Sequence, residues 1–229
     1  MDNNPNANRD PLATGRPLAH AWCLWEKYQE AYIQNSANYD KNLHVIYTYD
    51  TLEKFALLWK HTTYSRPSEL FFDLDKDVMK KFRIDGEETE EKIVDGLFVF
   101  KKDIEPKWED AANQRGCSIS LDIYNLPAEG IDQLWRDMIF AVTGQNFPFS
   151  DNINGFRILD RLKKHNFIKF ELWMCCGVSA YKPGPAEHKR NDEMVSAITE
   201  YTHELINRTH AISIYNLIKK EHFVANKVN

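Results

Sequence analysis

Two spacings of apolar residues alternate along this chain, and each predicts its own kind of element. Runs of β-branched and aromatic residues are typical of strands, and they occur at residues 20–28, 43–49, 96–101, 118–124, 156–162, 167–174 and 211–217. Apolar residues three and four positions apart predict amphipathic helices, which we expect at residues 52–59, 131–142 and 192–207. Asp50 is the expected N-cap of the first helix, because Glu53 follows three positions later.

The order of these elements favours the α+β class. Strands follow strands directly, and the three helices are too widely separated for a regular alternation of strand, helix and strand. We therefore expect an antiparallel sheet with its helices on one face, which leaves the other face for a ligand.

A single folded domain is expected over residues 17–217. The stretch 1–16 is rich in Asn, Asp and Pro and predicts a disordered N-terminal tail, and 218–229 is expected to be a C-terminal tail. Residues 64–95 are interpreted as an inserted acidic loop, with a short charged helix possible near 76–82.

Composition and charge exclude several classes of protein. The 229 residues are 43% hydrophobic and carry a net charge of −5, and the six acidic residues that accompany Lys92 in 85–95 account for all of it. A basic surface along the whole chain, as DNA binding needs, is therefore not expected. The sequence contains no apolar run long enough for a membrane span, and its polar N-terminus does not resemble a secretion signal.

The cysteines point to a reducing compartment. Their spacing is too irregular for a disulfide framework, since they are Cys23, Cys117, Cys175 and Cys176. We expect a cytoplasmic protein, with a nuclear pool as an alternative.

The sequence contains none of the glycine-rich, zinc-protease or nucleophile-elbow motifs of common enzymes. A hydrolase using Cys175 with His188 or His210 is an alternative, but a buried cysteine at a strand end is the preferred interpretation. Cys and His spacings match no zinc site. We expect no catalytic residue, no metal and no cofactor.

Two segments carry side chains suited to a charged nucleotide. In the polar loop 103–116, Trp108 precedes Glu109; an indole stacks on a base or a cation, and a carboxylate accepts two N–H groups of guanine. A structural anchor is the alternative for this tryptophan. The hairpin 157–169 has a local charge of +4, and Arg161 and Lys163 alternate as phosphate contacts would. A solvated ribbon with edge-protecting lysines is the alternative for the hairpin.

Four segments, in the same order, match those of a known family. They are PLAHAWCLW (17–25), the stretch 42–55, IEPKWEDAANQRG (104–116) and Leu134-Trp135. The sequence resembles the eukaryotic translation initiation factor 4E family, whose members bind the 7-methylguanosine cap of messenger RNA, over roughly residues 17–173. The resemblance implies a curved antiparallel sheet with three helices on its convex face and the cap in its concave face.

The resemblance implies how the base would be held. Two aromatic rings sandwich the positively charged methylated guanine. Trp108 is the implied second ring, and Tyr39, with Tyr32 as the fallback, stands where the family has a first tryptophan. Glu109 is implied to accept the guanine N1–H and N2–H, and Trp173 to touch the N7 methyl group.

The resemblance also implies the phosphate contacts, which are Arg161, Lys163 and Lys169. One contact departs from the family pattern, because Ser118 stands where the family has a phosphate-binding arginine.

Family members bind helical partner peptides on the convex face. The implied partner positions are Pro17, Leu52, Ala56, Trp59, Arg136 and Asp137. Ala56 aligns with a tryptophan and Arg136 with a leucine of the family, so we expect ordinary partner peptides to bind poorly and a distinct partner set to take their place.

The leading hypothesis is cap binding in translation initiation or its regulation, without catalysis. The expected partners are capped messenger RNA and a helical peptide of a scaffold or 4E-binding protein, with no DNA and no membrane. The alternative is an interaction module or translational repressor of the same fold with weak or no cap binding. Four tryptophans are expected in the core: Trp22, Trp25, Trp59 and Trp135.

Overall fold

One antiparallel sheet organises the computed structural model, which describes residues 15–29, 42–71, 79–83, 89–175, 185–208 and 218–225. Its strands are β1 (Pro17–Tyr28), β2 (Leu43–Thr51), β3 (Met79–Arg83), β4 (Thr89–Lys101), β5 (Cys117–Tyr124), β6 (Ile153–Arg161), β7 (Phe167–Met174) and β8 (Ile218–Ala225). The order across the sheet is β2-β1-β4-β6-β7-β5-β8, and β3 pairs with β4 off this path. The predicted α+β class is confirmed.

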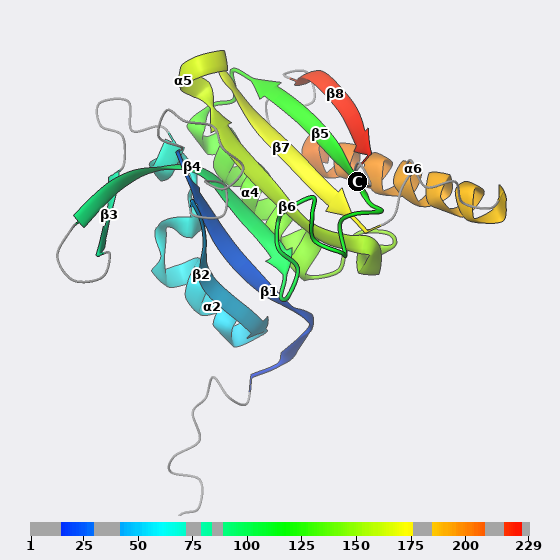
Figure 1. Cartoon of the computed structure of the whole chain (residues 1–229), viewed down its shortest axis with the longest axis horizontal. Coiled ribbons are helices and arrows are strands. Elements are labelled where there is room, and N and C mark those ends of the chain that lie inside the picture. The colour runs from blue at the N-terminus through cyan, green and yellow to red at the C-terminus, as the bar shows by residue number, and fades with distance from the viewer. Residues whose placement is uncertain are drawn as a thin grey trace, which may run out of the picture.

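The longer helices all lie on one side of this sheet. The helices are α2 (Leu52–His61), α3 (Ser68–Phe71), α4 (Ala128–Thr143), α5 (Leu162–His165) and α6 (Pro185–Arg208). Figure 1 shows α2, α4 and α6 behind the strands, whereas the loop between β4 and β5 crosses in front of β6. The three predicted helices correspond to α2, α4 and α6, although α6 begins at Pro185 rather than at residue 192.

The main core fills the space between the sheet and these helices. Alternate strand residues such as Leu24, Val99 and Leu121 enter it, because successive side chains of a strand point to opposite faces. Trp22 and Trp135 are fully buried in it, as predicted. The indole N–H of Trp135 donates to the Tyr64 carbonyl oxygen at 2.7 Å, so its polar atom is satisfied inside the core.

The N-cap of α2 differs by one residue from the prediction. Thr51, not Asp50, is the N-cap, and its hydroxyl accepts a hydrogen bond from the Lys54 backbone N–H at 3.3 Å. β2 continues through Asp50 to Thr51, so the N-cap lies one position later than predicted, and the helix begins at Leu52 as expected. Asp50 instead forms an ion pair with Lys54 at 2.8 Å.

The prediction of a loop over residues 64–95 is wrong for the part that the structure describes. It contains α3 and the β3–β4 hairpin, in which Met79 pairs with Ile93 and Arg83 with Thr89. The charged helix suggested near 76–82 is also wrong over β3, because its described residues are extended. Charged residues masked the strand pattern there.

The C-terminal prediction is wrong as well. The predicted strand 211–217 lies outside the described residues, and part of the predicted tail is the strand β8, which pairs with β5 over Ile218–Ala225. The connection between the predicted strands 156–162 and 167–174 is a short helix, α5, followed by Asn166 in the left-handed conformation (φ 56°). In the parts of the chain that the structure describes, no helix is long and apolar enough to cross a membrane.

Candidate functional site

A second, smaller apolar cluster lies on the face of the sheet opposite the helices, which we call the site face. Its buried members are Leu43, Phe98, Phe100, Leu159 and Trp173, and the partly buried Trp25, Ile104 and Trp108 pack against them. The strand residues of this cluster alternate with those of the main core, so the two clusters belong to opposite faces. Trp25 therefore packs on the site face and not in the main core, whereas Trp59 packs against the main core.

Trp108 and Trp173 are in face-to-face contact at the centre of this cluster. Their ring centroids are 3.6 Å apart and their planes differ by 15°. Phe100 meets Trp173 edge-on at 5.5 Å. Trp173 is only 1% exposed, and Trp108 is half-buried. The two tryptophans that the sequence singled out are thus brought together.

The loop that carries Trp108 is held in shape by its own polar side chains. The Asp110 carboxylate accepts hydrogen bonds from the backbone N–H groups of Glu105 and Ala112, both at 2.9 Å. The amide of Asn113 donates to the carbonyl oxygens of Glu105 at 2.9 Å and Lys107 at 2.8 Å. These bonds close the segment on both sides of Trp108.

Two further contacts fasten this loop to the sheet. Asn154 of β6 donates to the Ala112 carbonyl and to the Asn113 side-chain oxygen, each at 2.9 Å. Gly116 lies so close to β7 that an added Cβ would come within 1.9 Å of the Met174 carbonyl oxygen. The exposed Glu109 is therefore presented to solvent from a fixed backbone.

Two of the basic side chains on the site face contact acidic residues directly opposite on the neighbouring strand. Lys169 of β7 forms an ion pair with Asp122 of β5 at 2.8 Å and donates to the Ser120 hydroxyl at 3.3 Å. Arg157 of β6 forms an ion pair with Glu171 of β7 at 2.6 Å. Such cross-strand pairs stabilise a sheet.

Glu171 also links this pair to the aromatic cluster. Its carboxylate accepts a hydrogen bond from the Trp173 indole N–H at 3.2 Å. The Arg157 guanidinium carbon lies 4.9 Å from the Trp173 ring centroid and 5.4 Å from that of Phe98, within the range of cation–π attraction. The orientation of Trp173 is thus fixed by a hydrogen bond and by contacts on its ring.

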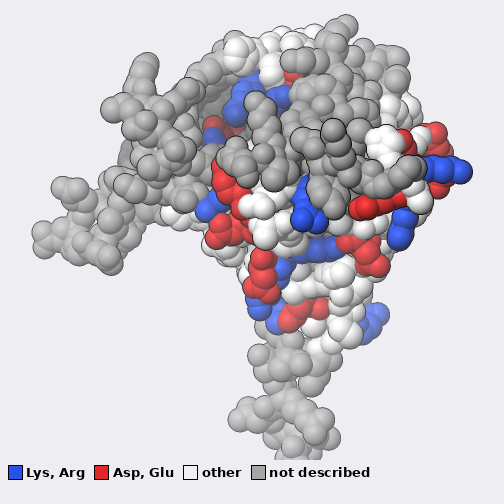
Figure 2. Space-filling view, turned by 45° about the vertical axis from the view of Figure 1, so that its right-hand side comes forward, with Lys and Arg blue, Asp and Glu red and all other residues white. Residues whose placement is uncertain are grey.

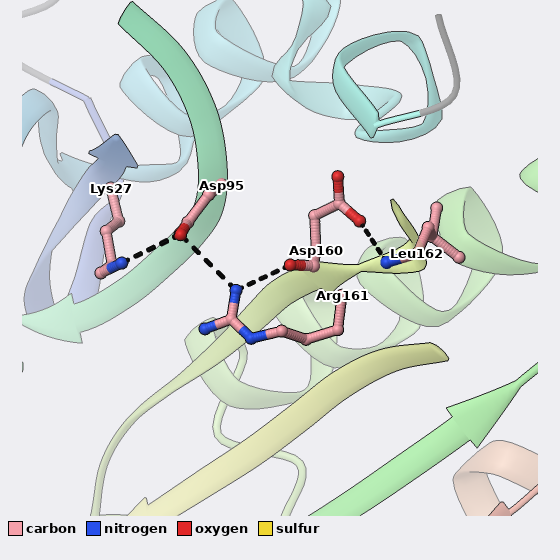
Figure 3. Close-up of polar contacts among 5 residues, drawn as sticks. All are labelled: Lys27, Asp95, Asp160, Arg161 and Leu162. Carbon is pink, nitrogen blue, oxygen red and sulfur yellow. Dashed lines mark hydrogen bonds and ion pairs between the residues drawn. The ribbon is translucent and has the colours of Figure 1, made fainter. Parts of the chain in front are cut away.

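A third acid–base contact joins three strands. Asp95 of β4 lies between Lys27 of β1, at 3.0 Å, and Arg161 of β6, at 3.5 Å (Figure 3). Arg161 also donates to the Asp160 carbonyl oxygen at 2.7 Å. Burial raises the pKa of the Asp160 carboxyl above its ordinary value, and the nearby Asp95 adds to this, against the hydrogen bond that Asp160 accepts from the Leu162 N–H.

The structure brings together only part of the predicted set. Arg161 and Lys169 lie on neighbouring strands, β6 and β7, of the sheet that carries the tryptophans. Lys163 belongs to α5, so the expected strand alternation with Arg161 is wrong. Tyr39 and Tyr32 lie outside the described residues. Ser118, opposite Trp173 on β5, is fully buried.

The acids of the site face were not singled out from the sequence. They are Asp95, Asp122 and Glu171, and Arg157 and the loop-fastening Asn154 were also missed. Strand alternation would have grouped Glu171 with Lys169 and Trp173, but the register that places Asp122 beside Lys169 needs the fold.

The hydrolase alternative gains no support from the described geometry. Cys175 donates to the Asn152 side-chain oxygen at 3.6 Å, whereas His188 is half exposed on α6 and pairs with Asp192. His210 lies outside the described residues. Among the residues that the structure describes, no group of His, Cys, Asp and Glu is arranged to hold a metal ion.

Five of the six implied partner positions lie on α2 and α4, the helices that also carry an aromatic cluster, and the sixth, Pro17, is on β1. Phe140 of α4 is 45% exposed and packs edge-on against Trp59 at 5.0 Å and Phe55 at 5.2 Å, both on α2. Among the implied positions Pro17, Leu52 and Arg136 are exposed, and Ala56, Trp59 and Asp137 are intermediate. Arg136 contacts the adjacent Asp137 at 3.1 Å. Phe140 was not predicted as part of this surface.

Comparison with known families gives a match over most of the chain. The model described as "Eukaryotic initiation factor 4E" matches residues 17–223. Eukaryotic translation initiation factor 4E1 of Drosophila melanogaster is 28% identical over 180 residues, which are 78% of this chain and 57% of the relative. The initiation factor 4E of Saccharomyces cerevisiae is 28% identical over 158 residues, 69% of this chain and 61% of the relative. The aligned part thus covers less than two thirds of these relatives.

Solved structures show the same fold. The Caenorhabditis elegans eIF4E-3 in complex with the 4E-binding protein Mextli and a cap analog matches with a TM-score of 0.59 and 18% identity, covering 86% of this chain and 89% of that one. A schistosome eIF4E complexed with m7GpppA and 4E-BP has a TM-score of 0.58 at 20% identity, covering 84% and 82%.

Proposed function

Because this chain belongs to the eukaryotic initiation factor 4E family, matched from residue 17 to residue 223, we propose that it binds the 7-methylguanosine cap of messenger RNA on its site face. The proposed role is translation initiation or its regulation in the cytoplasm. One domain, running from β1 to β8, would carry both the site face and the helices.

The observation that carries this proposal is the fixed loop that holds Trp108 against Trp173 with Glu109 exposed beside it. Methylation at N7 gives guanine a delocalised positive charge, which an indole face attracts. A carboxylate next to that ring accepts the guanine N1–H and N2–H, whereas adenine offers no such pair of donors. Trp108 and Glu109 together suit a methylated guanine.

The stacked tryptophans limit how the base can enter. Rings 3.6 Å apart are in van der Waals contact and leave no space for a base between them. The base therefore stacks on the outer face of Trp108, with Tyr39 or Tyr32 as the proposed opposite ring. Contact between Trp173 and the N7 methyl group requires Trp108 to move off Trp173.

The phosphates of the cap are proposed to reach the basic side chains of the neighbouring strands. Arg161 and Lys169 are the described candidates, and Lys163 at the start of α5 is the third. In this function no residue has a catalytic role, and binding involves no metal and no cofactor. The fixed site would bind and orient the nucleotide.

Tryptophan fluorescence during titration with 7-methylguanosine triphosphate tests this function. We expect quenching in the wild-type chain and a loss of affinity of about tenfold or more in Trp108→Ala and Glu109→Gln, since each removes a stacking or charge-assisted contact. Glu105→Gln is the matched control. It makes the same chemical change in the same loop, but the Glu105 carboxylate is already engaged by Lys107, at 2.7 Å, and has no proposed contact with the base. No binding by the wild-type chain, or equal binding by all variants, would refute the assignment.

A second proposed function is the binding of a helical peptide from a scaffold or 4E-binding protein on α2 and α4. Its specific support is the half-exposed Phe140, which packs on Trp59 across the two helices. Phe140 supplies a large aromatic surface on α4 that packs on Phe55 and Trp59, and these flank Ala56 in the sequence of α2, where the family has its tryptophan. If this surface binds protein but the site face binds no cap, the chain is an interaction module or a translational repressor.

The partner surface is tested with a peptide that carries Tyr-x-x-x-x-Leu followed by an apolar residue. Phe140→Ala is expected to weaken binding by about 30-fold, the usual effect of removing an aromatic anchor worth about 2 kcal/mol. Phe149→Ala is the control, because Phe149 is equally exposed but lies beyond the end of α4. Equal loss in both variants would argue against a specific role for Phe140.

A further inference from the structure

Three carboxylates stand next to the basic side chains of the site face. Lys169 contacts Asp122, Arg157 contacts Glu171, and Lys27 and Arg161 share Asp95. These four basic and three acidic side chains leave a single net positive charge. Each basic side chain that β6 and β7 bring to the site face, which are Arg157, Arg161 and Lys169, is therefore paired with a carboxylate once the strands are assembled.

A bulge in the sheet aims Asp95 at its two basic partners. Leu97 and Val99 point into the main core, so a strict two-residue period would turn Asp95 to the helices as well. Lys27 pairs with Gly96 and Tyr28 pairs with Val94, which makes Asp95 the extra residue of the bulge. A bulge redirects a side chain, and Asp95 consequently reaches the face where Lys27 and Arg161 lie (Figure 3).

The acid–base contacts are shielded from water. The Asp122 side chain is 5% exposed and that of its partner Lys169 is 21% exposed; the corresponding values are 17% for Asp95 and 28% for Arg161. Shielded charges interact more strongly than charges at the surface. A phosphate that approaches Arg161 or Lys169 therefore finds the cation already paired with a carboxylate. The negative charge of that carboxylate also repels the phosphate.

We propose that Asp95 and Asp122 act as resident counter-ions of Arg161 and Lys169, so that the site recognises its ligand mainly by the base and gains little from each added phosphate. This inference rests on the proposed cap-binding function and specifies its ligand preference. Glu171 is not included among these counter-ions, because its carboxylate also accepts a hydrogen bond from the Trp173 indole N–H and thus positions the ring. The burial of Ser118, where the family has a phosphate-binding arginine, agrees with a weak phosphate subsite.

The test is the affinity for 7-methylguanosine mono- and triphosphate, compared in four chains: wild type, Asp95→Asn, Asp122→Asn and Glu129→Gln. Glu129 is an exposed acid at the start of α4 and provides the same change in net charge away from the site face. We expect the affinity ratio of triphosphate to monophosphate to stay below about tenfold in the wild type and in Glu129→Gln, and to rise about tenfold in each Asn variant, the effect of one freed charge-assisted contact.

The ratio distinguishes this role from a structural one, because a damaged fold lowers the affinity for both nucleotides alike. Should Asp95→Asn fail to fold, the double variant Lys27→Met/Asp95→Asn removes the 9%-exposed Lys27 ammonium together with its carboxylate and still frees Arg161.

Two results would overturn this inference without refuting the proposed cap-binding function: a wild-type ratio above about tenfold, or ratios in the Asn variants equal to that of the wild type. If neither nucleotide binds any of the chains, both the inference and the proposed cap-binding function are wrong.

Discussion

At the scale of the residue, Asn113 and Asn154 decide how Trp108 and Glu109 are presented. Asn113 is fully buried, and its amide group holds two carbonyl oxygens of the loop. Asn154 donates both to this loop and to Asn113. Through these bonds both asparagines position Trp108 and Glu109, the residues proposed to contact the base.

Asn154→Ala is expected to lower the free energy of unfolding by about 1–3 kcal/mol, because one buried and one partly buried acceptor each lose a donor. Chemical denaturation measures this change. Asn146→Ala, at an exposed position after α4, serves as the control and should change stability by less than about 0.5 kcal/mol. Equal effects of the two substitutions would contradict the assigned role of Asn154.

The pH dependence of stability reports on Asp160. Burial raises the pKa of its carboxyl, so the folded state holds this proton to higher pH than the unfolded state does. The contribution of Asp160 to stability therefore falls as the pH rises through the window above its ordinary pKa of 3.8. In Asp160→Asn, which keeps an acceptor for the Leu162 N–H, stability relative to the wild type should increase as the pH rises from about 3 to 6.

Thermal unfolding at several pH values checks this sign. Asp151→Asn is a suitable comparison, since the Asp151 side chain is 83% exposed. A stability difference between Asp160→Asn and the wild type that decreases with pH would show that the carboxylate is stabilised, not disfavoured, by its surroundings.

At the scale of the element, the approach of the loop to β7 depends on Gly116. A Cβ at this position would come within 1.9 Å of the Met174 backbone oxygen, which cannot move without shifting the strand. Gly116→Ala is expected to destabilise the fold by at least about 1–3 kcal/mol, the usual cost of overpacking, and to weaken cap binding. In Gly130→Ala the nearest atom is the end of the Leu126 side chain, at 2.6 Å, which can move.

Calorimetry of both variants compares these costs. Gly130 lies in α4, where alanine favours the helix, so its substitution should be close to neutral. If the Gly116→Ala variant is as stable as the Gly130→Ala variant, the loop does not depend on close approach to β7 at this point.

The elements that could be predicted from the sequence are those whose apolar residues recur at one clear spacing, either helical or strand-like. The apolar positions of α4 lie on one helical face, with Leu134, Trp135 and Met138 all buried. The hairpin of β3 and β4 was missed because charged residues fill it, and β8 was missed because its strand pattern is broken by Lys219, Lys220 and Glu221. Pairing with a neighbour, which sequence periodicity does not report, stabilises these strands.

The candidate site was predictable to the extent that local sequence defines it. Trp108 and Glu109 stand out because an aromatic residue followed by acids in a polar loop is poorly suited to a core. The contact of Trp108 with Trp173 and the pairing of Asp95 with Arg161 join residues more than 60 positions apart. The first contact depends on how the loop is fastened to β6 and β7, and the second on strand register and a bulge. None of these features is written in the spacing of the sequence.

At the scale of the whole molecule, charge is distributed in small opposed groups. Among the described residues on the face seen in Figure 2, basic and acidic side chains alternate without forming a broad patch of one sign. The net charge of −5 resides in the segment 85–95, and the site face is nearly balanced. Such a surface suits the recognition of one nucleotide better than the tracking of a long phosphate backbone.

Cap recognition by cation–π stacking is tested most directly by comparing the affinities for 7-methylguanosine triphosphate and unmethylated guanosine triphosphate. The two ligands share every phosphate and the guanine edge, and only the methylated base carries a positive charge near neutral pH. We predict that the methylated nucleotide binds at least about tenfold more tightly, as expected for a desolvated cation on an indole face. Equal affinities, or no binding of either nucleotide, would contradict the proposed function.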